Sequence, residues 1–525
     1  MNLGPKLGPI EIASRTQRGP HSMTTLRTSH VAPWLASTGR AAARLAQRVL
    51  DAAFDGEQDR LLRWFGHAWA GALYLAGVAG WSYFLNGGQI QLNVHDWLEA
   101  SKRYAFLRDA LVSGQLPLHM LGTSGLRGVT DRYLSVADTL ISPQVVLLRY
   151  LDIGTFALFH ILLLYSLGFV GMLILRRRYG LSPVAFTAMF LLFTFNGHIS
   201  DHIGVGHVHW AAYFLIPFFA LLIFDVLERK VGWRWILLMS LLLFAIFLQG
   251  AFHLFVLCLA FMGVLALSRR DLLRPLAAGS AFSILLSMFR ILPPALDASK
   301  FDTEFLSGFT SVGEMLTALV NLKIPGIDEM RLGWLNPLGY WELDHFLGVL
   351  GLAFVFWLGV VPWFRPEAGL RRYQVLWIPI ALLSVHSIGQ VYRWIHILHV
   401  PFLSSQRVSS RLLFLPLAML IFLAAIHLQE RLKKQRWGNG VKVLTLALVG
   451  LGAQDLGQHL RGWRVENIAR VFGADPLDLS LYTVANHTDP PYIAALAVGL
   501  GVTLLTLLFL VFMAWNETKK TPGSP

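Results

Sequence analysis

Four groups of ionisable side chains lie beside apolar stretches of this chain, where a charge is costly to bury and therefore informative. The first is Asp96, in the sequence NVHDWLEASKRY, shortly after the first apolar stretch. A carboxylate there could act as a general base toward a hydroxyl group or bind a divalent cation. It could equally begin a helix, because Glu99 follows three positions later, as in a capping box.

The second group is a run of histidines without lysine or arginine, in the sequence NGHISDHIGVGHVHW. It contains His198, Asp201, His202, His207 and His209. His198 and His202 are four residues apart, so a helix would place them on one face with Asp201 alongside. These three side chains are a candidate metal site. The alternative is that histidines at a membrane interface bond to backbone groups and lipid headgroups.

The third group is basic and comprises Arg290, Arg393, Arg407 and Arg411. The planar fork of an arginine suits phosphate oxygens, so a lipid phosphate is one partner for these side chains. Anchoring to headgroups, or pairing with an acidic loop residue such as Asp344, is the alternative.

The fourth group is Glu342, Asp344 and His345, in the sequence YWELDHFLGVLGL. These side chains either line a cavity or cap the helix that the following apolar residues predict.

Twelve apolar stretches must position these groups. The chain is 55% hydrophobic and only 14% charged, which is typical of a membrane protein. A spanning helix needs about 20 mostly apolar residues. We therefore expect an all-α bundle of about 12 spans. The predicted spans are 65–86, 156–175, 181–196, 209–226, 235–250, 252–267, 275–292, 344–364, 374–389, 411–428, 441–455 and 492–514.

The distribution of lysine and arginine predicts how the bundle is oriented. Five alternate gaps between the spans hold 17 of these residues in 44 positions, whereas the remaining short gaps hold 8 in 120. The positive-inside rule places the basic gaps, and with them both termini, in the cytoplasm of a multi-pass protein of the cell membrane. The net charge of +13 does not indicate nucleic-acid binding, because no domain combines basic residues with interleaved aromatic ones.

The chain divides into a tail, a membrane domain and a short end. Residues 1–60 predict a basic cytoplasmic tail with an amphipathic helix, or alternatively a mitochondrial-type presequence. Residues 61–515 form the membrane domain, and 516–525 a cytoplasmic end. Two long outer loops, 87–155 and 293–343, could build a substrate cavity. Helices are expected within them at 97–113, ending at Gly114, at 143–151 and near 311–322.

The order of these features resembles the GT-C superfamily of integral-membrane glycosyltransferases, in particular its bacterial multi-spanning branch. The resemblance covers roughly residues 65–430. It rests on a first span, a long outer loop with an early aspartate, the stretch SGQLPL and a late arginine-rich segment. The matching residues are Asp96, Arg108, Leu111, Gly114, Leu116, Pro117, Gln406, Arg407, Ser410 and Arg411.

The resemblance implies a reaction and roles for the residues. A sugar carried on a polyprenyl phosphate would pass, usually with inversion, to a lipid, glycan or protein acceptor. Asp96 matches the first-loop carboxylate, a base or metal ligand, and Asp201 the second-loop acidic residue of the metal-using members. Their double-acidic motif is absent here, and His198 and His202 stand beside Asp201 instead, which leaves the use of Mg²⁺ or Mn²⁺ open. Arg407 and Arg411 would hold the donor phosphate.

The remaining candidates are assigned to substrate binding, and two other functions remain open. Arg290, Glu342, Asp344 and His345 are expected to line the substrate site. The main rival function is a transporter or a flippase for lipid-linked sugars, because twelve spans is a common transporter count. A noncatalytic scaffold is the third. A long first loop, and polar residues gathered at the outer ends of the spans, favour the enzyme.

Overall fold

The computed structural model describes residues 31–55, 60–301, 304–323, 338–365, 368–398 and 406–520. It is all-helical: in these ranges there are isolated β-bridges but no named strand. The chain forms two compact units, Met1–Val49 and Leu50–Pro525. Helix α1 (Val31–Phe54) supplies the helix expected in the tail.

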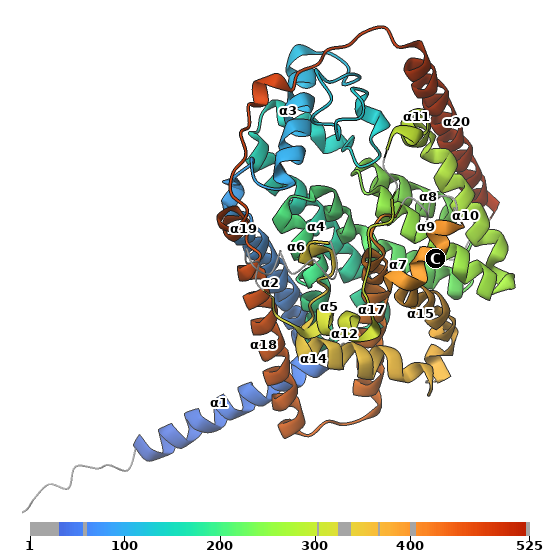
Figure 1. The fold of residues 1–525 in the computed structure, drawn as a ribbon. Coiled ribbons are helices and arrows are strands. Elements are labelled where there is room, and N and C mark those ends of the chain that lie inside the picture. The colour runs from blue at the N-terminus through green and yellow to red at the C-terminus, as the bar shows by residue number, and fades with distance from the viewer. Residues whose placement is uncertain are drawn as a thin grey trace, which may run out of the picture. The chain divides into compact units, whose positions relative to one another are not determined.

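Each of the twelve predicted apolar stretches contains a helix (Figure 1). The helices are α2 (Arg60–Phe84), α4 (Ile153–Tyr179), α5 (Pro183–Thr194), α7 (Ile216–Leu227), α8 (Trp233–Leu248), α9 (Phe252–Ser268), α10 (Leu273–Leu286), α14 (Gly348–Val355), α15 (Trp377–His386), α17 (Phe414–Lys434), α18 (Asn439–Gly462) and α20 (Pro490–Lys520).

The number of helices that can cross a membrane is smaller than twelve. Among the described residues, six helical segments are long and apolar enough to do so, or seven if a bent pair counts as one span. That pair consists of α10 and α11 (Met288–Asp297), which meet at an angle of 68°. Three further apolar helices are shorter than 18 residues. The expected all-α fold is therefore confirmed, with six or seven helices that could cross a membrane, and the count of 12 spans is not.

The helices differ in how deeply they lie in the bundle. The apolar stretch of the segment that contains α17 is 100% buried, whereas the corresponding stretches of α18 and α20 are only 6% and 22% buried. Leucine, valine and phenylalanine side chains cover the exposed faces of these two outer helices, which suits contact with lipid. The core thus centres on α17, which packs against α5.

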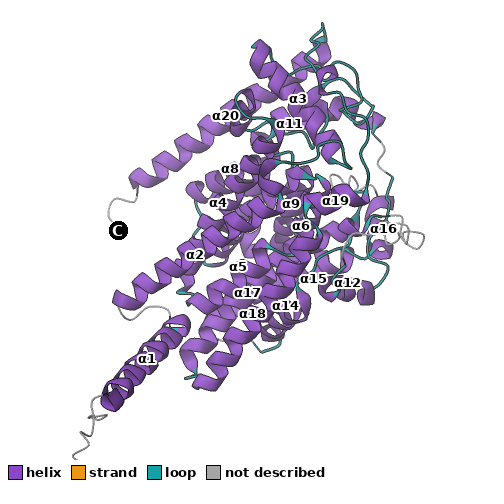
Figure 2. Cartoon of the chain, turned by 90° about the vertical axis from the view of Figure 1, so that its left-hand side faces the viewer, coloured by secondary structure: helices purple, strands orange, loops and turns teal. Residues whose placement is uncertain are grey.

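The first long loop forms a compact layer at one end of the bundle (Figure 2). Helix α3 (Trp97–Ser113) has the predicted bounds, and Gly114 ends it in the left-handed conformation with φ of +68°. The segment expected to be helical at 143–151 is a 3₁₀ helix, η3 (Pro143–Arg149), which packs against α3. Helix α12 (Val312–Val320) occupies the second long loop, as expected.

Candidate functional site

A cavity of about 1070 Å³ lies where the first long loop meets the helices. The start of α3 and the loop after it form one part of the wall, and the chain around 206–209 forms another. Helix α11, the junction of α8 and α9 around 247–253, and the segments around 340 and 407–411 form the rest. Its ionisable lining residues are His95, Asp96, Glu99, Arg103, Arg127, Asp138, His207, His209, His253, Arg290, Glu342, Arg407 and Arg411.

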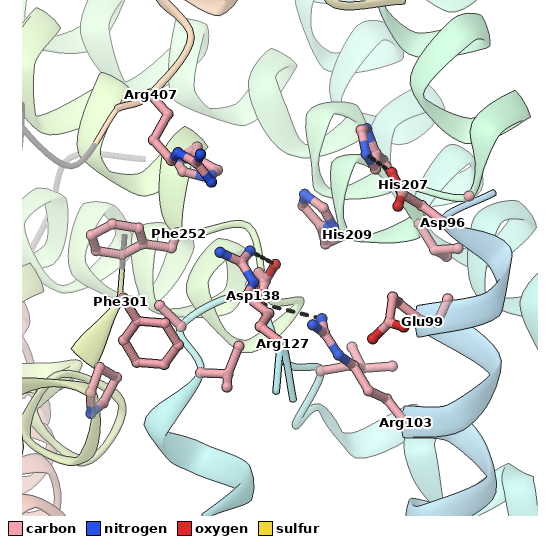
Figure 3. A pocket seen from close by; sticks show the side chains of 18 of the residues that line it. Asp96, Glu99, Arg103, Arg127, Asp138, His207, His209, Phe252, Phe301 and Arg407 are labelled. Carbon is pink, nitrogen blue, oxygen red and sulfur yellow. Dashed lines mark hydrogen bonds and ion pairs between the residues drawn. The ribbon is translucent and has the colours of Figure 1, made fainter. Parts of the chain in front are cut away.

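Asp96 lies at the start of α3, and its carboxylate does not cap the helix. Instead, its Oδ2 lies 2.5 Å from Nε2 of His207 and 3.4 Å from Nδ1 of His95. The capping alternative is therefore wrong for the side chain. Because its side chain is 41% exposed to the cavity, Asp96 can reach a ligand there (Figure 3).

A glycine brings His207 to Asp96. Gly206 has φ of +103° and lies against the backbone of Trp97, so a Cβ at position 206 would overlap the nitrogen of Trp97. The N–H of Asp96 donates to the carbonyl of Val205 at 3.1 Å in the same contact. The close approach of the two backbones thus needs glycine at this position.

Histidines extend from Asp96 into the bundle. Nδ1 of His207 lies 2.7 Å from Nδ1 of His202, and Nε2 of His202 lies 3.9 Å from Oε2 of Glu342. Glu342 accepts a two-pronged pair of bonds from Arg411, with 2.6 Å from Nε to Oε2. His202 is within hydrogen-bond distance of His207 but not of Glu342, from which 3.9 Å separates it, so this row of side chains positions His207 beside Asp96.

These neighbours also fix the charge on Asp96. Burial on its own would raise the pKa of Asp96, but the charges and hydrogen bonds of His207 and His95 outweigh it and hold the pKa well below the ordinary value. Asp96 is thus a carboxylate throughout the physiological pH range. A raised pKa, which would have made it a stronger base, is not what this environment produces.

Part of the cavity wall is rich in arginine, and one of these arginines, Arg103, stands on α3, which begins directly after Asp96. Asp138 lies between Arg127, with which it forms an ion pair, and Arg103, whose Nη1 is 3.3 Å from Oδ1 of Asp138. Burial would raise the pKa of Asp138, but these two guanidinium groups hold it well below its usual value. Figure 3 shows this trio, with Asp96 and His207 to one side and Arg407 to the other.

Arg290 is the buried member of the arginine wall. Its Nη2 donates to the carbonyl of Thr139 at 2.9 Å and to that of Ala137 at 3.1 Å. Its Nε and Nη1 are buried without a hydrogen-bond partner in the described part of the chain. Of the four outer arginines, Arg290, Arg407 and Arg411 line the cavity, whereas Arg393 on α16 (Gly389–Ile397) is exposed elsewhere.

Asp201 belongs to a second, closed cluster. It and Asp344 are fully buried, and His459 of α18 lies between them, with Nε2 at 3.5 Å from Asp201 and 3.0 Å from Asp344. Asp344 also accepts a bond from the N–H of Phe346 at 2.8 Å. None of these residues lines the cavity. Asp201 and Asp344 therefore cannot reach a ligand bound there.

The expected metal set of His198, His202 and Asp201 is not assembled. His198 and His202 do share a face of helix α6 (Gly197–Val205), with ring centroids 4.5 Å apart, but Asp201 points the other way, toward α18. The ring of His198 stacks on the rings of Phe414 and His345, with 4.9 Å between ring centroids in each pair. His345, like Asp344, lies outside the cavity. Successive residues of a helix are rotated by about 100°, so Asp201 points away from His202, which directly follows it in α6.

The donors at the cavity do not suit Mg²⁺ or Mn²⁺. Within the described ranges, the group there with ligand atoms within 4.8 Å of one another is His202, His207 and Glu342. Mg²⁺ and Mn²⁺ prefer oxygen ligands, whereas this group offers two imidazoles. Its single carboxylate is also occupied by Arg411. We therefore derive no catalytic step through a metal ion.

Several cavity residues were not singled out from the sequence. Arg103 was not among the candidates, and Glu99 was named only as the capping-box partner of Asp96, yet both line the cavity. Arg127 and Asp138 lie in loop sequence without periodicity. For His207 the sequence does offer one indication: Gly206 precedes it, and a glycine permits the close backbone approach that brings His207 to Asp96.

The known proteins give no family for this chain. Comparison with protein-family models, with curated proteins and with solved structures finds no match in any of the three. The cavity itself joins a carboxylate held ionised by histidines to a wall that is rich in arginine.

Proposed function

We propose that this protein is a membrane glycosyltransferase of the GT-C kind, which moves a sugar from a polyprenyl-phosphate-linked donor to a hydroxyl group of a lipid, glycan or protein acceptor. The observation that carries the proposal is the meeting of Asp96 with Arg407 and Arg411 in one cavity. These three residues were nominated separately from their sequence patterns, and transfer from a phosphate-linked sugar needs both kinds of group.

The size and lining of the cavity suit such a donor. Ligand pockets commonly measure roughly 300–1,000 Å³, so about 1070 Å³ accommodates a sugar phosphate together with the first part of a lipid chain. Five arginines provide charge for phosphate oxygens, and Phe252 and Phe301 provide an apolar surface on the side of Arg407 (Figure 3).

The chemistry requires a base at one end and cations at the other. The acceptor oxygen forms a bond to the anomeric carbon, its proton passes to Asp96, and the bond from that carbon to the phosphate oxygen breaks. The negative charge that develops on the phosphate is stabilised by Arg407 and Arg411. Because glycosyl transition states resemble an oxocarbenium ion, the proton can leave late, so a carboxylate with a low pKa is sufficient as base.

His207 keeps Asp96 ready for this step. It contacts Asp96 through Nε2 and His202 through Nδ1, so it fixes the carboxylate in place and favours its charged form. Because the pKa of Asp96 is held low, the proton that Asp96 receives passes on to water in the open cavity, and Asp96 is charged again before the next acceptor arrives. Asp96 is the catalytic residue in this scheme, and His207 is a positioning residue.

The test is an assay of glycosidic bond formation. The full chain is purified and placed in liposomes with radiolabelled polyprenyl-phosphate sugars and a panel of lipid, glycan and peptide acceptors. We expect a labelled product from the unaltered protein and a loss of about 10²- to 10⁴-fold in Asp96→Asn, as for removal of a general base. Glu466→Gln is the matched control, because the side chain of Glu466 is also 41% exposed but lies away from the cavity.

Two outcomes would overturn the proposal. If Asp96→Asn turns over like the Glu466→Gln control, the base is assigned wrongly. If labelled donor crosses the bilayer with its glycosidic bond unchanged, and no acceptor is labelled, the protein is a flippase for lipid-linked sugars.

A further inference from the structure

Two segments that are far apart in the sequence are joined by backbone hydrogen bonds beside α3. Isolated antiparallel bridges pair His119 with Arg132 and Met120 with Val484. The N–H of Met120 donates to the carbonyl of Asp131 at 2.8 Å, and the N–H of Ala485 donates to the carbonyl of His119 at 2.9 Å. These bonds fix the chain on which three side chains with metal-binding chemistry stand.

The three side chains are His119, Asp131 and His487. Each offers a ligand atom, and the three atoms lie within 4.8 Å of one another. Nε2 of His487 is 2.7 Å from Oδ2 of Asp131, and the rings of the two histidines have centroids 4.0 Å apart. His119 is fully buried, whereas the side chain of His487 is 53% exposed, so one side of the group is open to solvent.

Each histidine already has the outer partner that a metal-bound imidazole needs. Nε2 of His119 lies 3.2 Å from Asp489, and Nδ1 of His487 lies 3.3 Å from the carbonyl of Thr488. Arg132 donates to both oxygens of Asp489, at 2.6 and 3.0 Å, and so keeps that carboxylate in place. Metal-binding histidines characteristically give their second nitrogen to a carboxylate or a backbone carbonyl in this way.

One nitrogen remains unexplained without a further ligand. Nδ1 of His119 is buried and has no hydrogen-bond partner in the described parts of the chain. A buried polar atom left unpaired costs free energy, so it calls for an explanation. The ion pair between Asp131 and His487 does not involve this nitrogen, so it does not explain why the nitrogen is buried.

We propose that His119, Asp131 and His487 form a binding site for a divalent transition metal of the Zn²⁺ class. His119 would bind through Nδ1, His487 through Nε2, and a water molecule would take the fourth position on the exposed side. Two imidazoles and one carboxylate suit Zn²⁺ rather than Mg²⁺ or Ca²⁺, which prefer oxygen ligands. This site is independent of the proposed transferase reaction, since none of its ligands lines the cavity.

The metal would fasten the first long loop to the segment that leads into α20. Such a link is useful here because the chain contains a single cysteine, Cys258, which is buried and cannot form an intramolecular disulfide. The same loop contributes Arg127 and Asp138 to the cavity wall. The metal therefore stabilises the layer that carries part of the site.

The experiment measures Zn²⁺ bound by the full-length protein, purified with a tag that contains no histidine and stripped with a chelator. Bound metal is determined by elemental analysis after dialysis against Zn²⁺, and Co²⁺ is added in parallel as a spectroscopic probe of four-coordinate geometry. His487→Ala and Asp131→Asn are the test variants, because both side chains are partly exposed and their loss leaves the fold intact. His67→Ala is the control, since His67 is exposed on α2 and belongs to no group of ligands.

We expect His487→Ala and Asp131→Asn each to bind one equivalent of Zn²⁺ less than the unaltered protein and to lose the intense Co²⁺ absorption. His67→Ala should retain both. Zn²⁺ should also raise the thermal midpoint of the unaltered protein but not that of His487→Ala. Equal binding by all four proteins, or no binding by the unaltered protein at micromolar Zn²⁺, would overturn the proposal. The cavity holds a second group of histidines, which could also bind Zn²⁺. The decisive quantity is therefore the difference in bound Zn²⁺ between a variant and the unaltered protein, and not the total bound.

Discussion

Asp96 and Asp201 are two carboxylates with histidine partners in very different surroundings. Asp96 contacts His207 at the wall of a large cavity, and 41% of its side chain is exposed. Asp201 lies near His459 and Asp344, but it is fully buried and does not line this cavity. The comparison teaches that a histidine partner does not by itself make a catalytic carboxylate. Access to a ligand is the distinguishing property, and only Asp96 has it.

The ion pair of Glu342 and Arg411, which lines the same cavity as Asp96, gives the largest expected effect on stability. Replacing Arg411 by Met leaves Glu342, which is 8% exposed, without its counter-charge. Breaking a buried pair in this way costs about 3–5 kcal/mol. We therefore expect Arg411→Met to lower the thermal midpoint strongly, and the double variant with Glu342→Gln to recover most of the loss.

The double variant also separates stability from function. If Arg411 holds donor phosphate, transfer activity should stay low in the double variant although the fold is restored. Full recovery of activity together with stability would remove Arg411 from the phosphate site. A double variant as unstable as Arg411→Met would contradict the pairing itself.

The pH profile of transfer is the next way to sharpen the comparison. Burial pushes the pKa of Asp96 up and His207 and His95 pull it down, so Asp96 stays charged as pH falls from 7 to 5 and should not limit activity there. In His207→Asn the main lowering contact is lost and burial remains, so the pKa rises. Activity should then fall with acidity at a higher pH than in the unaltered protein.

The control for this profile is His209→Asn, since His209 lines the same cavity. It should reduce activity by an amount that does not depend on pH. Identical acid limbs in His207→Asn and the unaltered protein would show that His207 does not set the charge of Asp96.

Asp201→Asn should have the smallest effect. The amide keeps the shape of the side chain and removes one of two neighbouring buried carboxylates, so we expect stability to change by about 1 kcal/mol or less. The measurement is the thermal midpoint in the same detergent. A fall comparable to that of Arg411→Met would indicate that the charge of Asp201 is essential to the core.

The sequence predicted local structure better than the number of spans. Helix α3 has the predicted bounds because its apolar side chains recur at helical spacing and Gly114 ends it at positive φ. The span count differs because hydropathy does not reveal where a helix ends or bends. Helices α8, α9 and α15 have 16, 17 and 10 residues, and the α10–α11 pair turns by 68°.

The site was predicted in part, for a similar reason. Residue type and position near the membrane were enough to nominate Asp96, Arg407 and Arg411, which the cavity brings together. The partners of Asp201 were not accessible from the sequence, because His459 comes from a helix near the other end of the chain. Helical spacing placed His198 and His202 correctly but could not show that Asp201 faces away from them.

The most direct test compares the two carboxylates in one assay. The Asp96→Asn and Asp201→Asn proteins are placed in liposomes that contain the same labelled donor. Acceptor is then added, and the rate of the first transfer is measured. Access to the cavity predicts that Asp201→Asn transfers within about threefold of the unaltered protein, whereas Asp96→Asn is slower by about 10²-fold or more. Normal transfer by Asp96→Asn together with a loss in Asp201→Asn would contradict the assignment of the site.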